Sequence, residues 1–192
     1  MSKSQQNVFA FIRADFNRYK ATGGKSFFKM LLNPGFIGTS LIRLNRSLYY
    51  ALRPIPLIGT IYAVFNFIHL KFMQITFGFS IPEKVTIGKG IFISHLGTII
   101  INSDVCIGEN CNLGPMIVVG WGHSRGEYGV PQIGDRVFIG PGAKIFGPIK
   151  IGNDVAIGAN AVVNFDVPDR ATVVGNPGRI LENKGSGILI KY

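Results

Sequence analysis

The chain has 192 residues and a net charge of +10, which is concentrated at one end. Residues 1–82 hold ten Lys or Arg, one acid (Asp15) and fifteen aromatic residues, whereas residues 83–192 carry a net charge of only +1. Because these aromatic residues lie among Leu and Ile, the composition favours an anionic membrane surface as partner and argues against nucleic acid. Low cysteine use and no signal-peptide pattern in residues 1–10 predict a cytoplasmic protein, peripheral or monotopic on the cytoplasmic face of the inner membrane.

Residues 1–80 are predicted to form a basic, aromatic helical region. Its first helices span residues 7–20, 27–32 and 36–53, with breaks at Gly23-Gly24 and at Asn33-Pro34-Gly35. The third of these helices carries Arg43, Arg46 and Arg53, which we count among the residues of the basic surface.

Residues 57–79 form an apolar run of 23 residues with one full charge, Lys71. A spanning helix needs about 20 apolar residues, but only 17 residues separate Arg53 from Lys71, and two prolines begin the run. We therefore favour a monotopic helix that lies in the inner leaflet. A helix buried against the rest of the protein or another subunit, and a true span, are the alternatives.

An apolar residue recurs at every sixth position in the second half of the chain. The series is Ile133, Ile139, Ile145, Ile151, Ile157 and Val163, and an earlier one runs through Ile87, Ile93, Ile101, Ile107, Leu113 and Val119. A period of six fits neither a helix nor an alternating strand. It fits a short strand followed by a tight corner, at which Gly or Asn supplies the backbone angles. The repeat predicts a β-solenoid whose apolar residues stack from coil to coil.

Two irregularities interrupt the repeat, and each contains a histidine. The register slips by two residues between Ile93 and Ile101, around His95, and residues 121–132 form an extruded loop that contains His123. Insertions in solenoids lie at corners and often collect on a functional face. In the repeat frame Cys111 points inward and Cys106 outward, so we expect these cysteines not to pair.

The pattern [Ile/Val/Leu]-Gly-x-x-[small]-x resembles the hexapeptide repeat of left-handed parallel β-helices. The resemblance covers about residues 81–180 and leaves residues 181–192 as a tail. It implies an acetyl-CoA-dependent acyltransferase that works as a homotrimer, with active sites between neighbouring prisms. The segment around His95 resembles serine acetyltransferases, in which this histidine is the general base. An imidazole with a pKa of about 6.5 can take the proton of an alcohol and pass it to the departing thiolate.

The chain departs from the serine acetyltransferase pattern around the acceptor. Two aspartates of that family correspond to Ser94 and Ser80, and the Arg and His of its loop correspond to Gly129 and Val130. The charged partners that an α-amino acid needs are therefore missing, and Ser94 remains a candidate substrate contact. We expect a saccharide acceptor, as in bacterial polysaccharide O-acetyltransferases. A serine acetyltransferase that recognises serine differently and a non-catalytic, membrane-docked scaffold are the alternatives.

His123 is the rival candidate for the base. Galactoside and maltose O-acetyltransferases carry their base in a loop that precedes a Tyr-Gly-x-Pro-x-x-Ile-Gly run, which residues 128–134 resemble with one residue fewer between Pro131 and Ile133. Trp121, close to His123, could stack on a sugar or lie at a trimer interface.

Small residues at the corners are the candidates for holding coenzyme A. The predicted coenzyme-binding residues are Gly140, Pro141, Ala143, Gly158, Ala159, Asn164 and Arg179. Residues 175–179 resemble the Gly-Asn-Pro-Ala-Arg/Lys signature that closes these coils, and the Arg179 guanidinium suits a phosphate. No metal is expected, because a zinc site on this fold needs three histidines around each ion and the repeat region has two.

Overall fold

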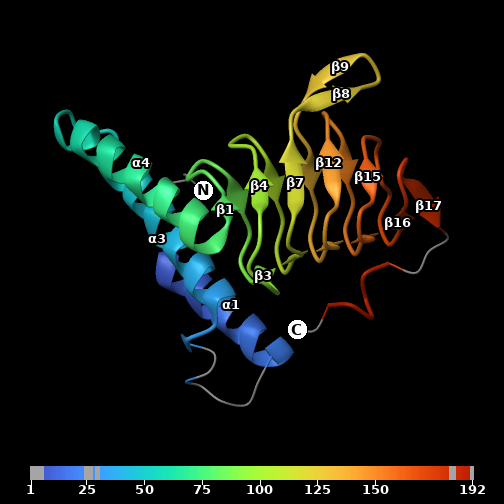
Figure 1. Cartoon of the computed structure of the whole chain (residues 1–192), viewed down its shortest axis with the longest axis horizontal. Helices are drawn as coiled ribbons and strands as arrows, with labels where there is room; N and C mark the ends of the chain where they lie inside the picture. The colour runs from blue at the N-terminus through green and yellow to red at the C-terminus, as the bar shows by residue number, and fades with distance from the viewer. Residues whose placement is uncertain (1–6, 24–27, 29–30, 182–184, 191–192) are drawn as a thin grey trace.

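The structure is a computed structural model that describes residues 7–23, 28, 31–181 and 185–190. Its described helices are α1 (Val8–Gly23), α3 (Pro34–Leu52) and α4 (Ile58–Phe77), and they lie at one end of a β-solenoid (Figure 1). The short helix predicted over residues 27–32 falls mostly outside the described residues.

Each of the first four turns of the solenoid contributes one short strand to each of three sheets. The first sheet contains β1 (Phe79–Ser80), β4 (Ile99–Ile101), β7 (Ile117–Gly120), β12 (Lys144–Phe146) and β15 (Val162–Val163). The second contains β2 (Thr86–Ile87), β5 (Cys106–Ile107), β10 (Gln132–Ile133) and β13 (Lys150–Ile151). The third contains β3 (Phe92–Ile93), β6 (Asn112–Leu113), β11 (Phe138–Ile139), β14 (Ala156–Ile157), β16 (Thr172–Val174) and the antiparallel β17 (Arg179–Leu181). The predicted left-handed β-helix of hexapeptide repeats, with a helical N-terminal region, is confirmed.

The predicted six-residue series forms the core of the prism. Ile133 pairs in register with Ile107 and Ile151, and Ile139 pairs with Leu113. The six inward residues of the series that runs from Ile133 to Val163 are each at most 5% exposed. Each inward residue therefore packs on the equivalent residue of the next coil, which is the arrangement that makes a short repeat stable.

The glycines that follow these inward residues serve a purpose that differs from the predicted one. Gly108 and Gly134 have no positive φ, but a Cβ at either would lie 2.5 to 2.8 Å from a carbonyl oxygen of the adjacent coil. The left-handed corner positions are instead held by residues such as Asn110 (φ 57°), Asp154 (φ 58°) and Asn160 (φ 55°). The sequence interpretation was thus right for Asn and wrong for these glycines, which permit a close approach of coils.

Helix α3 closes the open end of the solenoid, and this corrects the role predicted for two arginines. The Arg43 guanidinium donates to the carbonyl oxygens of Ile87 and Gly88 at 2.6 Å each. Arg46 donates to three successive carbonyl oxygens, those of residues 83–85. Both side chains are buried, at 5% and 8% exposure, so neither belongs to a basic surface. They bind carbonyl groups of an end coil, which has no further coil to pair with.

The segment Asn33-Pro34-Gly35, predicted as a helix stop, is the start of α3. The Asn33 side chain accepts hydrogen bonds from the backbone N–H groups of Gly35 and Phe36 at 2.9 and 3.2 Å. Pro34 occupies the first helical position, where its missing N–H costs nothing. The segment that was read as a helix stop is therefore also a helix start.

Candidate functional site

His95 lies on an enlarged corner of the solenoid, between β3 and β4. The inward residues Ile93 and Ile101 are eight positions apart, compared with six between Ile139 and Ile145 at an ordinary corner of the same edge. The two extra residues push Ser94 and His95 outward, and both are exposed. The register slip in the sequence therefore corresponds to a protrusion that presents an imidazole to solvent.

A groove of about 350 Å³ runs beside this corner. It is lined by Thr22, Phe92, Ser94, His95, Asn112, Leu113, Gly114, Phe138, Pro141 and Leu189. Asn112 is fixed at its base, because its side-chain oxygen accepts from Arg18 at 2.6 Å and its amide donates to the carbonyl of Leu189 at 3.4 Å. The groove thus combines one histidine, one oriented amide and mostly apolar walls, a composition typical of small-molecule sites.

The corners on the His95 edge stack into a continuous column. A Cβ added at Gly97 would meet Pro115, one at Gly114 would meet Pro141, and one at Gly140 would meet the N–H of Ala159. Gly140, Pro141, Gly158 and Ala159 therefore lie on the same edge of the prism as His95. Of the predicted coenzyme-binding residues, these four are brought into line with the candidate base.

The other three predicted coenzyme-binding residues are placed differently. Ala143 is fully buried, and its N–H and carbonyl are used by Gly140 and Val118, so its side chain faces the core and not a ligand. Asn164 is exposed on the corner after β15, which belongs to another edge. Arg179 is exposed on β17, opposite Val174.

Sequence reasoning missed several groove residues. Phe92, Asn112 and Phe138 each precede an inward residue of the third sheet, so the repeat frame could have placed them on one outer face. Thr22 and Leu189 come from α1 and from the C-terminal segment. No periodic signal in the sequence connects these two positions with His95.

His123 lies on a β-hairpin at a different edge. Strands β8 (Gly122–Ser124) and β9 (Glu127–Gly129) project between β7 and β10, away from β3 (Figure 1). Tyr128 packs against both His123 and Trp121, with ring centroids 4.7 and 5.1 Å apart, and the Trp121 contact is stacked. One face of Trp121 is therefore already covered. Within one chain the two solenoid histidines do not share a site.

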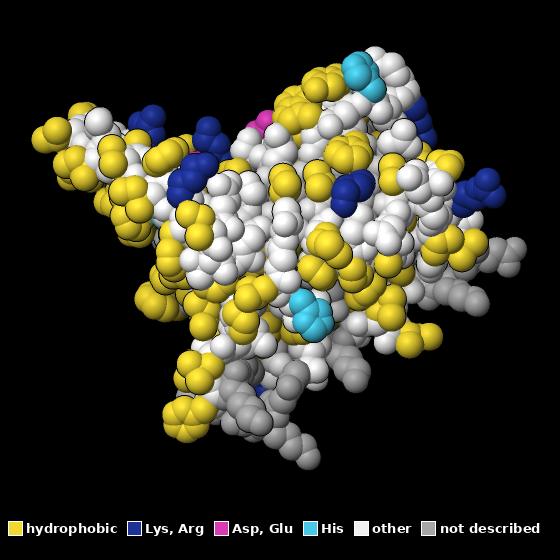
Figure 2. Space-filling view, viewed as in Figure 1, with side chains coloured by type: hydrophobic (Ala, Val, Ile, Leu, Met, Phe, Trp, Pro, Cys, Tyr) yellow, Lys and Arg dark blue, Asp and Glu magenta, His cyan; other side chains and the backbone are white. Residues whose placement is uncertain are grey.

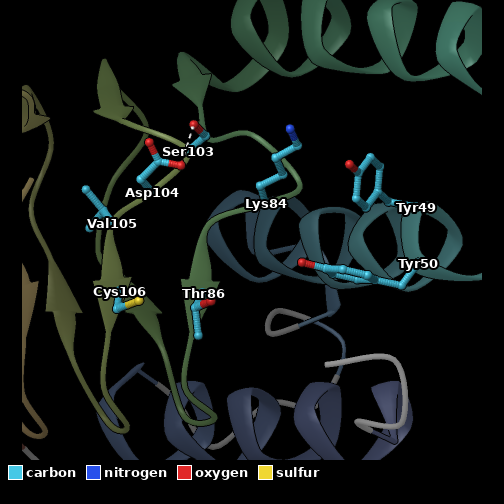
Figure 3. Close-up of a pocket in the computed structure, with 8 residues that line it drawn as sticks. All are labelled: Tyr49, Tyr50, Lys84, Thr86, Ser103, Asp104, Val105 and Cys106. Atoms are coloured by element: carbon cyan, nitrogen blue, oxygen red, sulfur yellow. Dashed lines mark hydrogen bonds between the residues drawn. The ribbon is translucent and has the colours of Figure 1, made fainter. Parts of the chain in front are cut away.

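A second cleft of about 290 Å³ lies between α3 and the second sheet (Figure 3). Its lining includes Tyr49, Tyr50, Lys84, Asp104 and Cys106. Neither histidine of the solenoid lines this cleft, so no imidazole there could act as general base toward a bound hydroxyl. Cys106 is exposed here, whereas Cys111 is buried in the core of the prism just before β6, and burial raises the pKa of the Cys111 thiol to about 12. Among the described residues, no three His, Cys, Asp or Glu are grouped to hold a metal ion.

Comparison with known proteins decides the family. The model of the bacterial transferase hexapeptide (six repeats) matches residues 131–164. A serine acetyltransferase of Mycobacterium tuberculosis is 40% identical over 111 residues, which cover 58% of this chain and 48% of that protein. The structure of soybean serine acetyltransferase superposes with a TM-score of 0.77 at 30% identity, covering 91% of this chain and 69% of that one. The chain belongs to the hexapeptide-repeat acyltransferases. The Neisseria gonorrhoeae serine acetyltransferase is similar at 26% identity, with a TM-score of 0.77 and coverage of 92% and 66%.

These comparisons correct the predicted acceptor. The expectation of a saccharide hydroxyl and of a role in surface polysaccharide synthesis was wrong, because the similar proteins are named serine acetyltransferases. The missing Asp and loop residues misled the interpretation, since a few changed side chains say less about the acceptor than 40% identity over 111 residues does. This hexapeptide-repeat acyltransferase spans about half the length of the curated relatives it matches.

Proposed function

We propose that this protein is an acetyl-CoA-dependent O-acetyltransferase whose acceptor is the hydroxyl of serine. The observation that carries the proposal is the exposed His95 on the enlarged corner, beside a groove and on the same edge as the stacked small residues. The similarity to serine acetyltransferases supports the choice of acceptor.

In the proposed reaction His95 removes the proton from the serine hydroxyl, and the oxygen attacks the thioester carbon of acetyl-CoA. The carbon–sulfur bond then breaks, and the coenzyme thiolate takes the proton from the imidazolium, which gives O-acetylserine and free coenzyme A. We propose that transfer is direct: neither cysteine of the chain lines the groove, and, among the described residues, no hydrogen bond joins the Ser94 hydroxyl to His95 to activate it as a nucleophile. Ser94, next to the base, is proposed to contact the acceptor.

For the coenzyme we propose a path along the edge formed by Gly140, Pro141, Gly158 and Ala159. Small side chains leave the backbone of these corners open to the amides of a pantetheine arm. Arg179, exposed beyond the last coil of that edge, is proposed to pair with a phosphate of the coenzyme, because a guanidinium binds phosphate through two hydrogen bonds.

We propose that the active unit is a homotrimer in which each site lies between two chains. His95 and the hairpin of His123 occupy different edges of the prism, so they can meet only across an interface between copies. In this arrangement His123 and Trp121 of one chain line the acceptor site opened by His95 of the next.

We also propose that the protein works at the cytoplasmic face of the inner membrane, to which its N-terminal helices attach. The observations in favour are two cysteines that are both free thiols and the apolar side chains that α4 leaves exposed.

The decisive experiment is release of coenzyme A from acetyl-CoA with free L-serine, using glycerol as a hydroxyl control and isothermal titration with coenzyme A as a second readout. Serine-dependent release well above the glycerol rate is expected. Binding of coenzyme A without serine-dependent release would overturn the acceptor. The absence of both binding and release would overturn the enzymatic proposal in favour of a non-catalytic scaffold.

A further inference from the structure

Among the described residues, helix α4 contacts the rest of the protein along one narrow line. Gly59, Tyr62, Met73 and Phe77 are its buried residues, and the Tyr62 hydroxyl donates to the side chain of Asn45 at 2.8 Å. The remaining surface of the helix exposes large apolar side chains. They are Ile58, Ile61, Val64, Phe65, Phe67, Ile68, Phe72 and Ile75, with exposures from 44% to 85%. The packing that α4 makes within the chain therefore leaves most of its apolar surface in water.

The exposed apolar residues face away from the protein. At about 100° per residue, Val64, Ile68 and Ile75 lie opposite the buried line of Tyr62 and Met73. The apolar positions together cover roughly half of the circumference. A partner helix in a coiled coil contacts a narrower seam, so this width favours immersion in an apolar medium.

The apolar surface continues beyond α4. Leu44 and Leu48 of α3, and Ile55 and Leu57 of the connecting turn, are all at least 40% exposed. The α3–α4 pair projects from the solenoid as an arm (Figure 1), and hydrophobic side chains gather along this arm with Lys and Arg beside them (Figure 2). Contiguous apolar surface of this kind marks an interaction site in a soluble protein.

The charges on the helical region select the partner. Asp15 is the only acid of residues 1–82, and it is buried and paired with Arg43 at 3.0 Å. With Arg43 and Arg46 used inside the fold, the exposed charges of the described helices and the α3–α4 turn are Arg13, Lys20, Arg53 and Lys71. All of these are positive, which complements an anionic surface. Lys71 lies on the exposed side of α4 and Arg53 just before it, where long side chains can reach lipid headgroups.

The connections of α4 argue against a helix that crosses the bilayer. Its length and composition alone would permit a span. Its C-terminus, however, passes through Gly78 into β1, which is paired with β4 in the solenoid. Midway along it, Asn66 accepts from Asn45 at 2.8 Å and donates to Glu83 at 3.1 Å. These contacts fix one side of the helix to the body of the protein along its length.

We propose that α4 docks on an anionic lipid bilayer and lies in the plane of the interface, with Val64, Ile68 and Ile75 toward the acyl chains. This inference rests on the proposed membrane association and makes it specific. Apolar burial provides most of the attachment and the basic residues assist, so high salt weakens binding without abolishing it.

The test is flotation of the full chain with vesicles of phosphatidylcholine and phosphatidylglycerol at low and at high salt. Wild-type protein is expected to float in both. The triple variant Val64→Gln, Ile68→Gln, Ile75→Gln should lose at least about tenfold in vesicle affinity, because three side chains no longer gain free energy from burial among the acyl chains. The fold should be kept, because all three side chains are exposed. A matched variant, Met116→Gln with Ile188→Gln, changes exposed apolar residues of the solenoid and tail and should float like wild type. Arg53→Gln with Lys71→Gln should weaken binding at low salt only.

The outcomes separate the two proposals. Wild-type protein that stays in the soluble fraction at both salt concentrations overturns membrane association altogether. If the particle in that fraction has twice the mass of the trimer, the α4 surface is an interface with a second copy. Flotation of wild type and triple variant alike overturns the role of α4. The depth of α4 in the bilayer is measured with the fluorescent variant Ile68→Trp, made after the single native tryptophan has been removed by Trp121→Phe. The fluorescence of this tryptophan should be quenched more strongly by lipids with bromine near the headgroup than by lipids with bromine near the ends of the acyl chains. The reverse order would show that α4 spans the bilayer.

Discussion

At the scale of single residues, buried side chains near the first coil hold the helices to the solenoid. Asp15 accepts from the N–H groups of Gly90 and Ile91 at 2.8 and 3.0 Å and from Arg43 at 3.0 and 3.2 Å. Tyr19 both accepts from the N–H of Ile93 and donates to its carbonyl. These bonds place α1 beside β3, and thereby fix the wall of the groove next to His95.

The first prediction concerns the base. His95→Ala should lower turnover by about 10²–10⁴-fold, because no other imidazole of the same chain lines the groove. The fold should be kept, since the side chain is exposed, and the thermal unfolding midpoint serves as control. Steady-state release of coenzyme A measures the effect. Near-normal turnover of His95→Ala, together with an inactive His123→Ala, would transfer the role to His123.

The second prediction concerns Asp15. Asp15→Ala leaves Arg43 without its carboxylate and two buried N–H groups without an acceptor. Removing one partner of a buried ion pair costs about 3–5 kcal/mol, so the free energy of unfolding in urea should fall by about that amount. Lys20→Ala, an exposed change on the same helix, should cost less than about 0.5 kcal/mol. Equal stability of the two variants would show that α1 contributes little to the fold.

At the scale of elements, two sets of contacts join each coil to the next. Backbone hydrogen bonds run between equivalent strands, as from Phe138 N–H to the carbonyl of Val155 at 2.9 Å. Side chains add a polar ladder at one corner, in which the N–H of Glu109 donates to Asp135 and the N–H of Asp135 donates to Asn153. The apolar stack inside and the polar ladder outside set the same register.

The third prediction tests the apolar stack. Ile145 is fully buried in β12 and pairs in register with Val119 and Val163. Ile145→Ala should cost about 2–5 kcal/mol in the free energy of unfolding, through lost burial and the cavity left behind. Lys150→Ala, an outward change on β13, is the matched control and should cost less than about 0.5 kcal/mol. The comparison is made by denaturant unfolding followed by circular dichroism, and a cost below 1 kcal/mol for Ile145→Ala would contradict the stacked core.

At the scale of the whole molecule, the separation of functional parts on different edges has consequences for assembly. His95 and the small corner residues share one edge, the hairpin lies on another, and the exposed surface of α4 lies at the end of the prism beyond both. A trimer of parallel prisms would bring the first two together and leave the helices free at one end.

The fourth prediction tests the shared site. A His95→Ala chain and a chain with residues 122–129 replaced by a short Gly-Ser linker should each be nearly inactive as purified trimers. Unfolding and refolding them together at equal amounts should restore activity to roughly a quarter of the wild-type level. In randomly assembled trimers, about one interface in four pairs an intact His95 from one chain with an intact hairpin from its neighbour. Activity that equals the mean of the two parents would show that each site belongs to one chain. Sedimentation of the mixture confirms that the trimer has formed.

The sequence by itself determined the solenoid. The six-residue period, the buried series from Ile133 to Val163 and the two-residue insertion at His95 are local properties, because each coil packs only on its neighbours. The tertiary structure decided the fate of the helical region and the walls of the groove. Arg43 contacts Ile87, Arg18 contacts Asn112, and Asn112 contacts Leu189, over separations of 44, 94 and 77 residues. No periodic pattern encodes such distant pairs, so only the folded chain shows that these arginines close the solenoid while the apolar surface of α4 remains uncovered.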